Sequence, residues 1–299
     1  MQKGKDKMID KDGIERPDKF DGNILEIKHT TRKIKFDDKY NYFPRNIFFR
    51  MWAAFFRALA ICFFNPYMVF KFKMKTFGGE NKKKLKGKPF VMTCNHVHLF
   101  DDVSIGTNLF CWRKIYYTTL QQNIQRPMIG FFLRSLGGIP IPATSISGMK
   151  KYNQDLSEIL KKNRPILFNP EGSMWPHYRE IRPYKRGAFS TAVKNDVPVL
   201  PIVLLFKGKK KKNGKYKYRI YFAICNPIYP DKTLSDEKSR SEKMMQQTYE
   251  TTKRVAEEWY QIQDCGFGDE KYTRKLRPHK DLFFENDQWI VTERKKSRK

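Results

Sequence analysis

The stretch 90–102, FVMTCNHVHLFDD, runs from apolar residues directly into two histidines and two aspartates. Its first six residues are typical of a short buried strand, and the polar residues after them predict a turn. In open α/β sheets, functional groups gather where strands end and helices begin. We therefore expect His96, which follows this strand, to lie where the fold places its chemistry.

The same alternation continues along the chain. Apolar runs predict strands at 69–77, 114–120, 165–170, 197–206 and 216–225, and amphipathic segments predict helices at 147–163 and 235–263. A basic stretch, 207–217, predicts a hairpin loop around Asn213-Gly214. Strands that alternate with helices predict an α/β fold with a mostly parallel central sheet flanked by helices. Since no internal repeat or Gly/Ser linker interrupts residues 69–263, we expect one domain there.

An apolar and aromatic segment, 43–72, precedes this domain. Arg50 and Arg57 interrupt it and share one face of a helix, and Asn65-Pro66 predicts a break. Because a spanning helix needs about 20 mostly apolar residues, the interruptions favour an interfacial, membrane-docking helix or a helical pair that dips into one leaflet. A buried core helix and a true spanning helix are the alternatives.

The two ends of the chain are polar. Residues 1–42 predict a flexible basic leader that has no secretory signal, and residues 264–299 predict a basic tail that ends in ERKKSRK. The five cysteines form no C-x-x-C motif, which argues against a disulfide framework or a zinc cage and favours a reducing compartment.

The composition allows a sizeable core and implies anionic partners. The chain is 40% hydrophobic and 15% aromatic, and its formal charge is +29, from 60 basic and 31 acidic residues. Such a surface favours nucleic acid, acidic lipid headgroups or phosphorylated substrates, and a lysine-rich surface that serves solubility alone is the simplest alternative.

Two histidine–aspartate pairs are possible in the opening stretch. His98 and Asp102 are four residues apart and would share a helix face, whereas His96 and Asp101 are five apart and meet only if His96 lies on the turn before the helix. Spacing alone slightly favours His98 with Asp102. A loop of solvated histidines is the non-functional alternative, and a metal site lacks an obvious third ligand.

A second stretch, LFNPEGSMWPHYREIRPYKRGAF at 167–189, also begins at a strand end. It places Glu171, Gly172 and Ser173 in the following loop, where glycine permits close approach of a ligand to the backbone. Its later cations can hold a phosphate; they are Arg179, Arg182, Lys185 and Arg186. By itself, a solvated basic loop explains this stretch equally well.

Together these stretches resemble the glycerolipid acyltransferases of the 1-acylglycerol-3-phosphate acyltransferase type. NHVHLFD is similar to that family's N-H-x-x-x-x-D motif, and His96 and Asp101 take its places. NPEGS resembles F-P-E-G-T, and RPYKRGAF resembles P-F-K-K-G-A-F. GGIPIPA at 137–143 falls where G-x-I-F-x-x-R would lie, and VPVLPIVL resembles V-P-I-V-P-V. The blocks keep the family's order over about residues 69–230.

The resemblance implies transfer of an acyl group from acyl-CoA or acyl carrier protein to the free hydroxyl of 1-acylglycerol-3-phosphate. His96 would act as the general base and Asp101 would orient it. Asn95 would belong to the turn beside the oxyanion. The residues expected to bind the acceptor are Glu171, Gly172, Ser173, Arg179 and Lys185. No metal or other cofactor is expected, and the implied location is the cytoplasmic face of an anionic membrane, monotopic or peripheral.

This sequence departs from the family pattern where the acceptor's phosphate is concerned. Ala143 and Met174 stand at positions of family arginines, and Asn169 replaces a phenylalanine. Arg179, Arg182, Lys185 and Lys150 are the cations left to replace them. A second reading is therefore an O-acyltransferase for another lysophospholipid or a lipid alcohol. A non-catalytic basic protein that binds membranes or nucleic acid is the alternative from another class, although no nucleic-acid motif is present.

Overall fold

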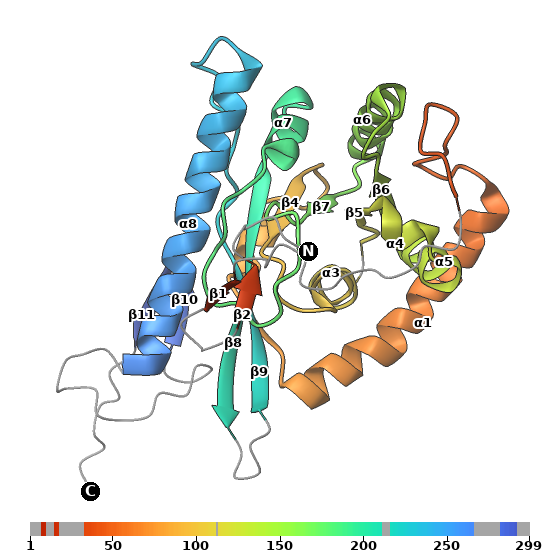
Figure 1. The fold of residues 1–299 in the computed structure, drawn as a ribbon. Helices are drawn as coiled ribbons and strands as arrows, with labels where there is room; N and C mark the ends of the chain where they lie inside the picture. Colours follow the sequence, from red (N-terminus) through yellow and green to blue (C-terminus); the bar gives the residue numbers. More distant parts are fainter. Residues whose placement is uncertain are drawn as a thin grey trace, which may run out of the picture.

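The computed structural model describes residues 33–111, 113–210, 216–265 and 282–291, and the backbone of the short strands Lys7–Ile9 (β1) and Glu15–Pro17 (β2). At its centre is a seven-stranded sheet with the order β3-β9-β8-β4-β7-β5-β6 (Figure 1). Its strands are Lys75–Phe77 (β3), Val91–Cys94 (β4), Tyr116–Leu120 (β5), Gly138–Ile141 (β6), Ile166–Phe168 (β7), Val199–Lys210 (β8) and Tyr216–Ile224 (β9). All neighbours from β8 to β6 are parallel, whereas β9 pairs antiparallel with β8 and β3 pairs parallel with β9, so β3 and β9 run opposite to the other five strands. The predicted mostly parallel α/β sheet is confirmed.

Helices cover both faces of this sheet. They are Ile47–Phe72 (α1), Gly79–Lys83 (α2), Asp101–Ser104 (α3), the π-helix Ile105–Leu109, Gln121–Gln125 (α4), Pro127–Leu136 (α5), Ile146–Lys161 (α6), Gly187–Lys194 (α7) and Glu237–Cys265 (α8). Met92 and Leu167 pack towards α1 and the π-helix, whereas Val91 and Ile166 pack towards α6 and α7. Strands buried on both faces read as continuous apolar runs, which is why the sequence pattern located them.

The two strands that flank the predicted loop at 207–217 form the expected antiparallel hairpin. β8 and β9 pair from Ile202 with Ile224 out to Lys210 with Tyr216. The turn itself, residues 211–215, lies outside the described residues.

The apolar segment differs from its prediction. It is one helix, α1, that continues through Pro66 to Phe72, so Asn65-Pro66 does not break it and 69–72 is not a strand. A proline inside a helix removes one backbone hydrogen bond; tertiary contacts on both sides offset that loss, because Phe64 packs against Phe100 and Phe72 stacks on Tyr218.

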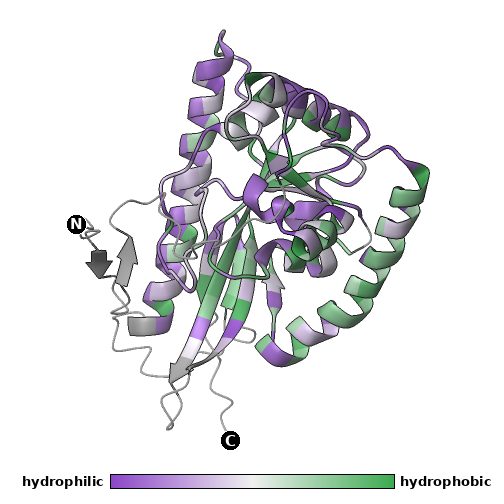
Figure 2. Cartoon of the chain, turned by 45° about the vertical axis from the view of Figure 1, so that its right-hand side comes forward, coloured by the Kyte–Doolittle hydropathy of each residue, from purple (hydrophilic) through white to green (hydrophobic). Residues whose placement is uncertain are grey.

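The length and composition of α1 would allow it to cross a membrane, but only 6% of its most apolar part is buried in the fold. The core-helix alternative is therefore wrong. α1 lies along the domain instead: Trp52 donates its indole N–H to Ser135 Oγ at 3.0 Å, and Phe56 stacks on Phe132 of α5. Figure 2 shows that most of α1 is hydrophobic, and its apolar residues Phe48, Phe63 and Phe70 are exposed.

Both predicted flexible ends contain packed structure. Residues 33–42 belong to the expected leader, yet Phe36 and Tyr42 are buried against α6. The expected tail contains a hairpin, Leu282–Glu285 (β10) with Gln288–Val291 (β11), whose Trp289 is buried against Trp259 of α8. Residues 266–281 and 292–299 lie outside the described residues.

The hairpin should contribute to the stability of the whole domain. Trp289→Ala removes a buried ring and its hydrogen bond to the Val255 carbonyl, so we expect the free energy of unfolding to fall by about 3–5 kcal/mol. Urea denaturation followed by far-UV circular dichroism measures this. Ile290→Ala, on the exposed side of the same strand, is the control, and equal losses for the two variants would show that the hairpin does not dock as described.

Candidate active site

The candidate site lies at the carboxyl edge of the parallel strands. β4 and β7 are neighbours in register, with Thr93 opposite Phe168. The loops that follow these strands therefore start side by side, and the backbone N–H of His96 donates to Glu171 Oε2 at 3.1 Å. The structure thus brings together the two stretches that the sequence analysis singled out.

His96 pairs with Asp101. His96 lies on the loop before α3 and Asp101 is the first residue of that helix, so His96 Nδ1 and Asp101 Oδ2 approach to 2.8 Å across the turn. The Asp101 carboxylate is buried, whereas 24% of the His96 side chain is exposed. Among the described residues, no group bonds to His96 Nε2, the nitrogen that remains for a substrate. A carboxylate on Nδ1 favours the tautomer with its proton on that nitrogen, which leaves Nε2 basic.

The charges around His96 favour its protonated form. Burial alone would lower its pKa, but the adjacent Asp101 carboxylate, with smaller contributions from Asp102 and Glu171, outweighs burial and raises the pKa to about 9. The free imidazole is therefore a strong base that is mostly protonated at neutral pH.

His98 does not pair with Asp102, contrary to what spacing slightly favoured. Its Nδ1 accepts the Phe100 backbone N–H at 3.2 Å, and its Nε2 lies 3.2 Å from the Tyr218 hydroxyl. Burial lowers its pKa to about 4. With both nitrogens engaged inside an aromatic surround, His98 remains neutral and acts as packing.

Asp102 connects the two loops at a second point. Its Oδ1 accepts the side-chain amide of Asn169 at 2.8 Å. Burial and the neighbouring Asp101 raise the Asp102 pKa to about 7. Asn169 stands where the family pattern has phenylalanine, and at this position the chain has a hydrogen bond between the two loops.

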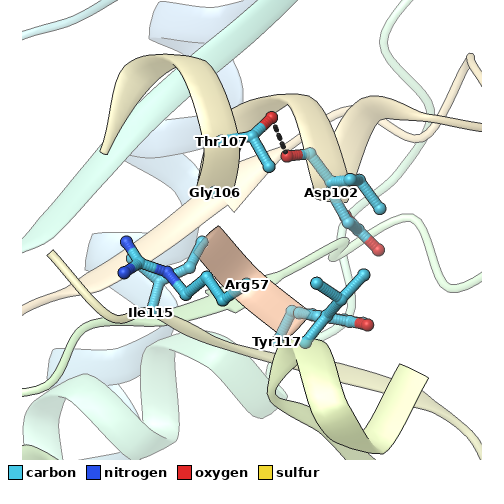
Figure 3. Close-up of a pocket in the computed structure, with 8 residues that line it drawn as sticks. Arg57, Asp102, Gly106, Thr107, Ile115 and Tyr117 are labelled. Atoms are coloured by element: carbon cyan, nitrogen blue, oxygen red, sulfur yellow. Dashed lines mark hydrogen bonds between the residues drawn. The ribbon is translucent and has the colours of Figure 1, made fainter. Parts of the chain in front are cut away.

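A small cavity lies behind α3 (Figure 3). Its volume is about 20 Å³, enough for roughly one water molecule. Asp102, Ile115 and Tyr117 are among the residues that line it, and the Thr107 hydroxyl donates to the Val103 carbonyl at its rim. A cavity of this size cannot take an acyl chain.

Glu171 and Ser173 are buried rather than open to an acceptor. Glu171 forms a fully buried ion pair with Arg182, at 2.6 Å between Oε2 and Nη2, and also accepts the Arg182 backbone N–H at 3.0 Å. Arg182 Nη1 donates to Ser173 Oγ at 2.7 Å, and its guanidinium lies over the Trp175 ring. Arg182 is therefore unavailable to a substrate phosphate.

Other predicted residues remain near the surface. Gly172 has a positive φ of 79°, and a Cβ added there would lie 2.8 Å from Lys185 Nζ, so this turn requires glycine. Lys185 is exposed, and Arg179 is half-buried over the Tyr260 ring. Asn95, in contrast, is buried: its amide bonds to both backbone groups of Leu204, so its side chain fixes the turn and does not face an oxyanion.

Sequence reasoning missed three partners. Tyr218 comes from β9, 120 positions after His98, and no spacing signals such a contact. The Arg182 ion pair was hidden because its basic neighbours made it resemble a solvated loop. Asn169 had a signal, since it departs from the family pattern beside Asp102. Among the described residues, no group of three or more His, Cys, Asp or Glu side chains is arranged to hold a metal ion.

Comparison with known proteins agrees with the motifs in this site. The model of the acyltransferase family matches residues 76–205, which include His96, Asp101 and Glu171. The matched segment covers less than half of the chain, and within it the chain is similar to the acyltransferase family.

Two curated proteins that this chain resembles are named for the same activity. A 1-acyl-sn-glycerol-3-phosphate acyltransferase of Chlamydomonas reinhardtii is 30% identical over 48% of this chain and 42% of its own length. A chloroplastic one of Brassica napus is 30% identical over 50% and 44%. The chain spans less than half the length of these two relatives. The solved PlsC acyltransferase of Thermotoga maritima has a TM-score of 0.46 and 21% identity, over 72% of this chain and 96% of the other.

The buried ion pair makes a stability prediction. Arg182→Met leaves the Glu171 carboxylate buried without its partner, so we expect the free energy of unfolding to fall by about 3–5 kcal/mol. Arg186→Met is the control, because its pair with Glu242 is exposed and should be worth less than about 1 kcal/mol. Urea denaturation compares the two. Similar losses would mean that Arg182 is solvated in solution.

Proposed function

We propose that this protein transfers an acyl group from acyl-CoA or acyl carrier protein to the free hydroxyl of 1-acylglycerol-3-phosphate. The observation that carries the proposal is the His96–Asp101 pair, with Nδ1 held by a buried carboxylate and Nε2 accessible. The names of the relatives support the reaction, and the match of the family model supports the chemistry.

In this mechanism the residues move one proton. His96 Nε2 accepts the proton of the acceptor hydroxyl as its oxygen attacks the thioester carbonyl. The new C–O bond forms, the C–S bond breaks, and the imidazolium returns the proton to the leaving thiolate. Asp101 stabilises the imidazolium while it exists. The substrate hydroxyl replaces a serine nucleophile, so the enzyme needs no acyl intermediate.

We also propose that α1 docks the enzyme on an anionic membrane surface. Its exposed residues Phe48, Phe63 and Phe70 are distributed along the whole helix, and α5 adds Met128 beside it. An apolar helix face combined with a basic surface provides the two signals that stable docking needs. A position on the cytoplasmic face follows from the same proposal, because that leaflet carries anionic lipid.

A second acceptor has specific support. Ala143 and Met174 replace family arginines, and Arg182 is engaged with Glu171. Lys185 lies beside the Gly172 turn, but the positions of Ala143 and Met174 supply no cation to a phosphate. Another lysophospholipid or a lipid alcohol is therefore the alternative acceptor.

The direct test compares two histidines. His96→Gln removes the base, so we expect kcat to fall by about 10²–10⁴-fold. His98→Gln alters only packing and should change kcat by less than about tenfold, or 1.4 kcal/mol. Acyl transfer is measured with labelled donors and a panel of lysophospholipids and lipid alcohols. Full activity of His96→Gln would rule out this mechanism, and the preferred acceptor decides between the two substrate proposals.

The pH dependence provides an independent check. Only neutral His96 accepts a proton, and its pKa is raised to about 9, so kcat/KM should rise with pH and level off near that value. Asp101→Asn removes the charge that raises the pKa, so the rise should move down towards the usual value near 6.5 while the plateau falls. A pH-independent rate between neutrality and the plateau would show that His96 does not titrate in the reaction.

A further inference from the structure

A shallow pit lies at the edge of the sheet opposite His96. Lys114 precedes β5 and Arg164 precedes β7, so both lie at the amino ends of strands whose carboxyl ends face the candidate site. The pit forms where the first turns of α1 cross this edge, and Phe49, Arg50 and Lys114 are among its lining residues. We name Arg50, Lys114 and Arg164 the cationic seam.

The cationic seam lacks acidic partners among the described residues, and Lys114 Nζ lies over the Tyr116 ring, 5.1 Å from its centroid. Within the described part of the chain, the charged groups of Arg50, Lys114 and Arg164 make no hydrogen bond or ion pair with another residue. Burial, together with the nearby charges of Arg164, Arg50 and Arg57, lowers the pKa of Lys114 to about 8. Like charges held together at a partly buried position repel one another, and a bound anion would offset that repulsion.

The neighbouring groups do not provide that anion. On α6, Glu158 pairs with Arg45 and Lys162, and Asp155 pairs with Lys151. Two further arginines beside the seam are also engaged with carbonyl groups. Arg57 donates to those of Phe110, Cys111 and Arg113, and Arg134 donates to those of Asn41, Tyr42 and Gly138.

The surroundings of the seam point to a lipid rather than a soluble anion. Arg50 belongs to α1, and its neighbours Phe48 and Met51 are 78% and 63% exposed. A cationic pit beside an exposed apolar helix matches the boundary between headgroups and acyl chains in a bilayer. We propose that the cationic seam binds the phosphate of an anionic phospholipid in the membrane on which α1 lies. The inference rests on the proposed docking of α1 but does not depend on acyl transfer.

This lipid is distinct from the acceptor. The seam lies beside the N-terminal half of α1, whereas the residues that contact the candidate site, such as Phe64 and Phe72, lie in its C-terminal half. Because α1 is roughly 40 Å long at 1.5 Å per residue, one headgroup cannot serve both places. The bound lipid would hold one end of α1 at the headgroup level while the other end presents the active site.

The test measures vesicle binding of the full chain with the seam neutralised. Arg50→Gln, Lys114→Gln and Arg164→Gln are combined, and flotation is measured with phosphatidylcholine vesicles with and without phosphatidylglycerol. We expect the preference for the anionic vesicles to fall at least about tenfold, since each cation near an anionic surface contributes to binding. Binding to pure phosphatidylcholine should not change.

The matched control removes the same charge elsewhere. This control combines Lys194→Gln, Lys238→Gln and Lys253→Gln. The three lysines lie on α7 and α8, across the sheet from α1 (Figure 1). This variant should keep most of the preference. If both variants lose the preference for anionic vesicles equally, the attraction comes from net charge and not from the seam. If neither variant loses it, the proposal is also overturned.

Two further measurements separate the remaining outcomes. In calorimetry with inorganic phosphate and glycerol phosphate, we expect no difference in binding between wild type and the seam variant. If wild type binds these anions and the seam variant does not, the ligand is a soluble phosphate and not a lipid. Acyl transfer between water-soluble short-chain substrates should be the same in wild type and seam variant. If the wild type shows acyl transfer but no preference for anionic vesicles, the seam alone is overturned. If the wild type shows no acyl transfer, the result counts against the proposed function.

Discussion

The buried carboxylate of Glu171 is the constraint on which the candidate site depends. It accepts hydrogen bonds from the backbone of His96 and from both the backbone and the side chain of Arg182. The loop after β4 and the loop after β7, which are far apart in the sequence, therefore meet at one side chain. The cost of burying this charge is offset only while all its partners remain in place, so the position of His96 is fixed before any substrate arrives.

Two further hydrogen-bonded contacts reinforce the same arrangement. Asn95 ties the end of β4 to Leu204 of β8, and Asn169 ties the β7 loop to Asp102. The outcome is a loop whose backbone is held on both sides while the outer nitrogen of His96 stays accessible. Groups held in this way need little reorganisation during a reaction, which is where much of the catalytic advantage of an active site originates.

The sequence contained enough to predict the sheet and the place of the site. Strands buried on both faces are visible as apolar runs, and the order of those runs fixed a parallel α/β fold. The pairing of His96 with Asp101 was less accessible, because a separation of five residues works only across the turn that precedes α3. The prediction of this pair came from the resemblance to the family's N-H-x-x-x-x-D motif and not from residue spacing.

The rest depended on contacts that no local pattern encodes. α1 continues through Pro66 because the domain holds it on both sides of that residue. Arg182 belongs to a basic stretch, yet Trp175 and Ser173 enclose it. The hairpin of β10 and β11 follows a segment of charged residues and is defined by where Trp289 inserts. In each case tertiary packing overrides the local signal.

α1 is fastened to the domain near both of its ends, by Trp52 on Ser135 and by Phe72 on Tyr218. A helix joined at one end could swing on a membrane while its domain tumbled above. A helix that is attached at two points fixes the orientation of the whole domain relative to the membrane. On a bilayer the whole protein would then travel with one side permanently facing the lipid, and each encounter with a substrate in the leaflet would occur in two dimensions and in a single orientation.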